Sequence, residues 1–166
     1  MKAVGIVVEY NPFHNGHAYH VKQAKLETSA DVVISVMSGQ FLQRGEPALV
    51  DKWTRTKMAL ESGVDIVVEL PYVYSTAQAT DFAYGAISLL DAIGCKTFVF
   101  GSETGRIEPF LQTYEGIHTH ANLYNEEISK AVKAGLSYPM ALQKAYLAVE
   151  QTVNIEMVDL SLPNNI

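Results

Sequence analysis

Cysteine, long apolar runs and positive charge are all scarce in this chain of 166 residues. Its single cysteine, Cys95, has no partner for an intrachain disulfide, so we expect a reducing, cytoplasmic compartment. The first apolar run, residues 3–8, is too short to cross a bilayer, and no signal-peptide cleavage pattern follows it, so no membrane association is expected. With 12 Lys and Arg against 18 Asp and Glu, the chain has no general attraction to a phosphate backbone.

Short apolar segments rich in Val and Ile predict buried strands, which we place at residues 3–8, 32–37, 66–70 and 98–100. Helical stretches separate these strands, and they are expected at residues 16–26, 51–62 and 77–93. Gly63 and Gly94 follow two of these helices as C-terminal stops. The alternating order predicts an α/β fold with an open, doubly wound parallel sheet, whose ligand crevice lies at the carboxyl ends of the strands.

The sequence beyond residue 106 is more polar and mainly helical, with helices expected at residues 109–116, 125–134 and 139–152. We therefore expect a core at residues 1–106 and a mostly helical continuation at residues 107–166. The chain ends on the turn signal LPNN followed by a bare apolar residue, which favours an interruption of a longer protein.

The segment EYNPFHNGH, residues 9–17, carries the strongest chemical signal, because it lies between a predicted strand and a predicted helix. Gly16 lets the backbone approach a phosphate closely, and the helix start offers N–H groups and a positive dipole end. His14 and His17 add donors that can stabilise the charge of a transferring phosphoryl group.

Two other interpretations of these histidines remain. They can be ordinary residues of a helix start, or His14, His17 and His20 can share a helical face and bind a metal. Because no cluster of cysteines or carboxylates completes a coordination shell, no metal site is predicted on this segment.

The loop after the second strand, residues 38–48, is the next candidate. Arg44 offers a planar fork that suits a carboxylate or a phosphate, and Gly39 permits close backbone approach. The cationic residues Lys52 and Arg55 follow on a helix start. The alternative is a long surface loop with ordinary charges.

Carboxylates and aromatic residues also lie near the predicted strand ends. Glu69 and Asp81 can bind Mg²⁺ through water, although Asp81 is equally suited to support a helix start. Trp53, Tyr72 and Tyr74 can stack on a base, but packing against the sheet is the favoured interpretation.

Residues 14–17, HNGH, match the HxGH signature of nucleotidyltransferases, which have Rossmann-like folds. The longer segments EYNPFHNGHAYH, MSGQFLQRGEPALVDKWTRTKMAL, GVDIVVELP and FGSE resemble the bacterial tRNA(Met) cytidine acetate ligase family. The resemblance covers about residues 2–103 and resumes at residues 162–166.

This resemblance implies activation of acetate with ATP to acetyl-adenylate and pyrophosphate, followed by acetylation of N4 of the wobble cytidine (C34) of elongator tRNA(Met). The resemblance implies ATP as the nucleotide, and ATP chemistry usually requires Mg²⁺. Because of their donor chemistry, we expect His14 and His17 to be the catalytic pair. The implied ATP-binding residues are Val7, Val8, Glu9, Tyr10, Asn11, Pro12, Phe13, His14, Asn15, Gly16, His17, Ala18, Tyr19, His20, Gly101 and Asn164. The acetate candidates are Ser38, Gly39, Gln43 and Arg44.

The superfamily's second signature, a helix start that grips the phosphates, is not found in the sequence, and the local basic clusters are small. We therefore expect tRNA recognition to depend largely on residues beyond this chain. Two alternatives stay open: an adenylyltransferase acting on a phosphorylated metabolite, as in coenzyme A or NAD synthesis, and a catalytically silent nucleotide-binding module.

Overall fold

The computed structural model describes residues 1–103, 105–153 and 157–158. The chain forms two compact units, Met1–Phe100 and Gly101–Ile166. The second unit begins a few residues before the boundary expected after residue 106.

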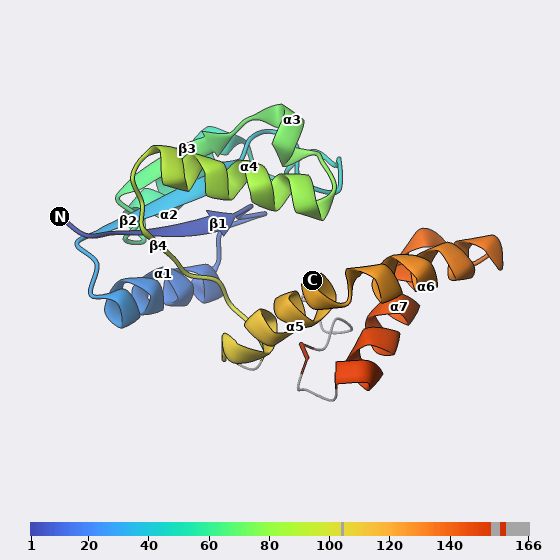
Figure 1. The fold of residues 1–166 in the computed structure, drawn as a ribbon. Coiled ribbons are helices and arrows are strands. Elements are labelled where there is room, and N and C mark those ends of the chain that lie inside the picture. Colours follow the sequence, from blue (N-terminus) through green and yellow to red (C-terminus); the bar gives the residue numbers. More distant parts are fainter. Residues whose placement is uncertain (104, 154–156, 159–166) are drawn as a thin grey trace. The chain divides into compact units, whose positions relative to one another are not determined.

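The first unit is built on a parallel sheet of four strands in the order β3-β2-β1-β4 (Figure 1). The strands are β1 (Ala3–Val8), β2 (Val32–Ser38), β3 (Ile66–Leu70) and β4 (Thr97–Phe98). β4 is shorter than expected, although the Val99 N–H still donates to the Gly5 carbonyl at 3.0 Å. The predicted α/β fold with a doubly wound parallel sheet is confirmed.

Helices cover both faces of this sheet, as Figure 1 shows for α1 and α4. On one face, Val21 and Ala24 of α1 (Asn15–Thr28) and Ala59 of α2 (Lys52–Glu61) pack in one cluster with the strands. On the other face, α4 (Ala79–Ala92) contributes Leu90. A Cβ atom at Gly5 would lie 2.6 Å from the Leu90 side chain, so only glycine lets α4 approach β1 this closely.

A short helix, α3 (Tyr72–Ser75), lies in the segment after β3 where only a loop was expected. Tyr74 of this helix packs on α4, because a Cβ atom at Gly85 would come within 2.3 Å of the Tyr74 ring. Tyr74 is half-buried, whereas the neighbouring Tyr72 is 67% exposed. The packing role expected for the aromatic residues therefore holds for Tyr74 but not for Tyr72, nor for Trp53 on α2, which is 72% exposed.

The second unit contains α5 (Glu108–Thr119), α6 (Ala121–Lys133) and α7 (Tyr138–Val153), which confirms the helical continuation. Its core gathers around Tyr146, Val149 and Met157. The Thr113 hydroxyl accepts a hydrogen bond from the Val158 N–H at 2.8 Å. Within the described ranges, no helix combines the length and apolar character needed to span a bilayer.

Candidate functional site

The loop between β1 and α1 is shaped by Tyr10. This residue has the left-handed φ of 53°, a conformation that costs an ordinary residue roughly 1–2 kcal/mol. The ring is only 2% exposed, and its hydroxyl lies 3.3 Å from the Ser35 hydroxyl of β2. It packs edge-on against Phe13 at 4.7 Å and His17 at 4.9 Å between ring centroids. The buried Tyr10 ring thus packs against the His17 ring and helps to fix its orientation.

His14 and His17 cap the start of α1 reciprocally. The Gly16 N–H donates to Nδ1 of His14 at 3.1 Å, and the His14 N–H donates to Nδ1 of His17 at 3.2 Å. The two rings stack at 3.7 Å between centroids. Because Nδ1 is the acceptor in both rings, each neutral imidazole carries its proton on Nε2, an assignment that follows from the hydrogen-bond partners. The loop therefore presents two Nε2–H donors.

His17 stays neutral at physiological pH. Burial is the main cause that lowers its pKa, and repulsion from His14 and His20 adds to it, which brings the pKa from 6.5 to about 4. A neutral imidazole fixed in this tautomer keeps its Nε2–H available to donate to a developing negative charge. Since His14 occupies the Gly16 amide, an anion that uses this amide has to displace the His14 ring.

A second loop, residues 39–50, is fastened onto the first. The Gln43 N–H donates to the Glu9 carboxylate, and the Leu49 N–H donates to the Asn11 side-chain oxygen, both at 2.7 Å. The Gln43 side chain also donates to the Ala77 carbonyl at 2.9 Å. Glu9 and Asn11 therefore order the loops that follow β1 and β2.

Arg55 is the structural residue that we did not anticipate. We expected it on a cationic helix start, but its side chain is fully buried. Its guanidinium donates to the carbonyls of Val50 at 2.8 Å, Glu9 at 2.6 Å and Ser38 at 3.1 Å, and also to that of Gly39. Burial lowers the pKa of Arg55, but an arginine stays charged under all ordinary conditions. Arg55 thus ties together the carboxyl ends of β1 and β2.

One sequence signal pointed to this role. Arg55 is one turn before Ala59 on α2, so both side chains share a helical face, and Ala59 is completely buried. A cation on the core-facing stripe of a helix needs internal acceptors, and the backbone carbonyls at two strand ends supply them.

The four acetate candidates do not share one surface. Ser38 and Gly39 are buried, Gln43 is half-buried, and Arg44 is exposed at the turn of the loop next to Gly45, whose φ is +78°. The Ser38 hydroxyl has no hydrogen-bond partner among the described residues.

Of the other ATP candidates, Val7 and Val8 lie on β1 and Ala18, Tyr19 and His20 on α1, whereas Gly101 belongs to the second unit. Gly101 is exposed at its start, and a Cβ atom there would have open space around it. Asn164 lies outside the described residues.

The carboxylates considered for Mg²⁺ already have partners. Glu69 pairs with Lys52 at 2.6 Å, and Asp81 accepts from the Gln78 side chain at 3.3 Å. No group of three or more His, Cys, Asp and Glu side chains in the described parts of the chain could hold a metal ion.

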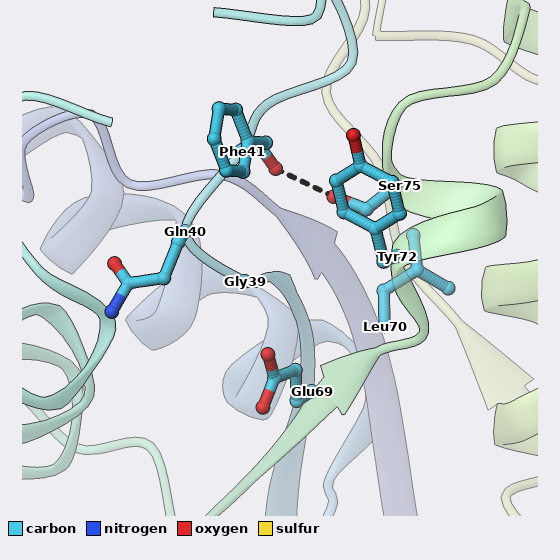
Figure 2. Close-up of a pocket in the computed structure, with 7 residues that line it drawn as sticks. All are labelled: Gly39, Gln40, Phe41, Glu69, Leu70, Tyr72 and Ser75. Atoms are coloured by element: carbon cyan, nitrogen blue, oxygen red, sulfur yellow. Dashed lines mark hydrogen bonds between the residues drawn. The ribbon is translucent and has the colours of Figure 1, made fainter. Parts of the chain in front are cut away.

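A pocket of about 250 Å³ opens at the carboxyl ends of β2 and β3 (Figure 2). Its lining consists of Gly39, Gln40, Phe41, Glu69, Leu70, Tyr72 and Ser75. Glu69 lies on one side of the Gly39 backbone, and the rings of Phe41 and Tyr72 lie on the other.

A strand, a tight loop and a helix start with two histidine donors form the arrangement of a nucleotidyltransferase site, and comparison with known proteins agrees. The family profile described as HIGH nucleotidyl transferase matches residues 1–166. This chain belongs to that family.

Two relatives named tRNA(Met) cytidine acetate ligase are similar over the whole chain. That of Lysinibacillus sphaericus is 64% identical and that of Bacillus subtilis 54% identical, and the match covers 41% and 40% of their lengths. This chain thus spans about two fifths of the curated relatives it matches. The crystal structure of Thermotoga maritima TmcAL bound with alpha-thio ATP superposes with a TM-score of 0.83 at 46% identity. That match covers 93% of this chain and 37% of the other.

Proposed function

We propose that the protein carrying this chain is an ATP-dependent tRNA(Met) cytidine acetate ligase. The observation that carries the proposal is the pair of Nε2–H donors, His14 and His17, in a chain 64% identical to a protein of that name. The related structure with alpha-thio ATP supports ATP as the nucleotide. We place the reaction in the cytoplasm.

In the first step, a carboxylate oxygen of acetate attacks the α-phosphorus of ATP, and pyrophosphate leaves. Negative charge grows on the phosphoryl oxygens, and the Nε2–H groups of His14 and His17 stabilise it because they are fixed before the reaction begins. The ATP-binding set extends from Val7 to His20 and includes Gly101 and Asn164. Since no carboxylate cage exists among the described residues, Mg²⁺ would arrive with the phosphates and neutralise their charge.

In the second step, N4 of the wobble cytidine attacks the acetyl carbon, AMP leaves, and N4 loses one proton. Acetate binding is assigned in this proposal to the candidates Ser38, Gly39, Gln43 and Arg44. Because Ser38 and Gly39 are buried, the exposed Arg44 is the group that would contact the carboxylate. The chain has a net charge of −6 and therefore no general attraction to a phosphate backbone. All tRNA contacts other than those to the wobble cytosine are therefore assigned to the remainder of the protein.

The deciding experiment is exchange of labelled pyrophosphate into ATP, measured with the full-length protein over a panel of small carboxylates. Exchange that requires acetate supports the ligase. An adenylyltransferase would exchange with a phosphorylated metabolite instead and would retain AMP in its product. A silent nucleotide-binding module would bind ATP without any exchange.

A further inference from the structure

The pocket in Figure 2 has an aromatic wall that is open to solvent. Phe41 and Tyr72 meet edge to face, with 5.8 Å between ring centroids and an interplanar angle of 85°. Phe41 is 39% exposed and Tyr72 67% exposed, so neither residue is buried in the hydrophobic core. The Ser75 hydroxyl donates to the Phe41 carbonyl at 2.7 Å and fixes the loop against α3. Aromatic faces held in this way are stacking surfaces for a planar ring.

The opposite wall is a carboxylate with one oriented oxygen. Lys52 donates to Oε2 of Glu69 at 2.6 Å, and Oε1 faces Gly39. A Cβ atom at Gly39 would lie 2.4 Å from Oε1, so a larger residue there would push the Glu69 carboxylate aside. An ionised carboxylate only accepts hydrogen bonds, and it repels a second anion. This side of the pocket therefore suits an N–H donor and does not suit acetate or phosphate.

The volume of about 250 Å³ sets the size of the ligand. A water molecule occupies about 30 Å³ of liquid, so the pocket accepts a small ring and not merely an ion. A stacking wall opposite a glutamate acceptor is the combination that recognises cytosine, whose exocyclic N4 amino group donates to Asp or Glu.

We propose that this pocket binds the cytosine base that receives the acetyl group, a site distinct from the ATP-binding loop of His14 and His17. Tyr72 stacks on the base, the perpendicular ring of Phe41 meets the edge of the base, and Oε1 of Glu69 accepts one N4 hydrogen. The assignment of the base as an acetyl acceptor rests on the proposed function. Its recognition of an amino-bearing pyrimidine rests on the pocket alone.

The first test uses nucleosides as probes. Cytidine should shift the backbone amide NMR signals of Gly39 and Tyr72 in the full-length protein, and uridine should shift them less because its O4 is an acceptor. In Glu69→Gln, Lys52 holds the amide oxygen and the NH₂ group faces the ligand, so the preference should reverse toward uridine. Equal shifts with both nucleosides in both proteins, or no shift at millimolar concentration, would overturn the proposal that this pocket binds cytosine.

The second test separates the two chemical steps in the full-length enzyme. Tyr72→Ala should lower kcat/KM for tRNA acetylation by about 5- to 100-fold, the usual loss for one base-stacking ring. Acetate-dependent pyrophosphate exchange should stay within about 2-fold, because no tRNA takes part in that step. Tyr84→Ala is the matched control, since Tyr84 is 66% exposed on α4 and lies outside the pocket lining.

The outcomes distinguish this inference from the proposed function. If wild-type protein shows no acetate-dependent exchange, the proposed function fails. The nucleoside titration then still tests whether the pocket recognises an amino-bearing pyrimidine. Exchange that Tyr72→Ala abolishes would assign the pocket to ATP or acetate and overturn the inference. Unchanged tRNA acetylation in Tyr72→Ala would overturn it as well.

Discussion

Replacing Arg55 with methionine should destabilise the first unit more than any other single change on α2. The substitution keeps a long apolar stem but removes every donor to the carbonyls of Glu9, Ser38, Gly39 and Val50. A hydrogen bond to a charged group contributes about 1.5–3 kcal/mol, and a buried acceptor left unpaired costs about 1–3 kcal/mol. Because these bonds form one network, their effects do not add, and we expect a loss of about 3–5 kcal/mol in the free energy of unfolding.

The assay is urea denaturation followed by far-UV circular dichroism. Arg55→Lys keeps the charge but loses the planar fork, so it should recover only part of the stability. Lys57→Met is the matched control on the same helix, because the Lys57 side chain is 76% exposed and its pair with Glu61 spans 3.9 Å. The control should change the free energy of unfolding by no more than about 0.5 kcal/mol. If Arg55→Met unfolds within about 1 kcal/mol of the wild type, the guanidinium does not hold the strand ends together.

The remaining predictions concern the two loops. His17→Ala should slow pyrophosphate exchange by about 10²- to 10³-fold with an unchanged far-UV spectrum, and full activity would refute its assigned role. The His17 ring should titrate near pH 4 by ¹⁵N NMR, in the Nε2–H form above that value. Since the unfolded ring binds a proton near pH 6.5 and the folded ring only near pH 4, stability should fall between those values on acidification, and less so in His17→Gln. Arg44→Ala should raise the KM for acetate far more than that for ATP, whereas the reverse would make Arg44 a phosphate ligand.

The sheet and its helices were predictable because their signals are local. Runs of Val and Ile gave β1 and β3 with the bounds that the structure shows. Gly63 and Gly94 have φ values of +103° and +78°, so they end α2 and α4 where a residue with a Cβ would be strained. Such features depend on neighbours within a few positions, and one sequence is enough to find them.

The interior of the site was not predictable, because its contacts join distant residues. Arg55 donates to the Glu9 carbonyl 46 positions away, whereas the sequence only placed this arginine with Lys52 on a cationic helix start. The reciprocal cap of His14 and His17 was hidden for another reason, since histidine is not among the usual capping residues. The exposure of Tyr72 depends on α3, a single helical turn that no periodicity in the sequence indicates.

The contacts of Glu9 suggest why the loops after β1 and β2 have to move together. Its carboxylate accepts from the Gln43 N–H, and its carbonyl accepts from Arg55, which also holds Ser38. A displacement of the second loop is therefore passed to the backbone that leads into the histidine cap. Hydrogen-bond donors stabilise a transition state best when they are fixed in advance, because no reorganisation is then needed at the moment of reaction. Under the proposed function, Arg55 and the Glu9 backbone would therefore support the phosphate chemistry of His14 and His17 by keeping this backbone rigid.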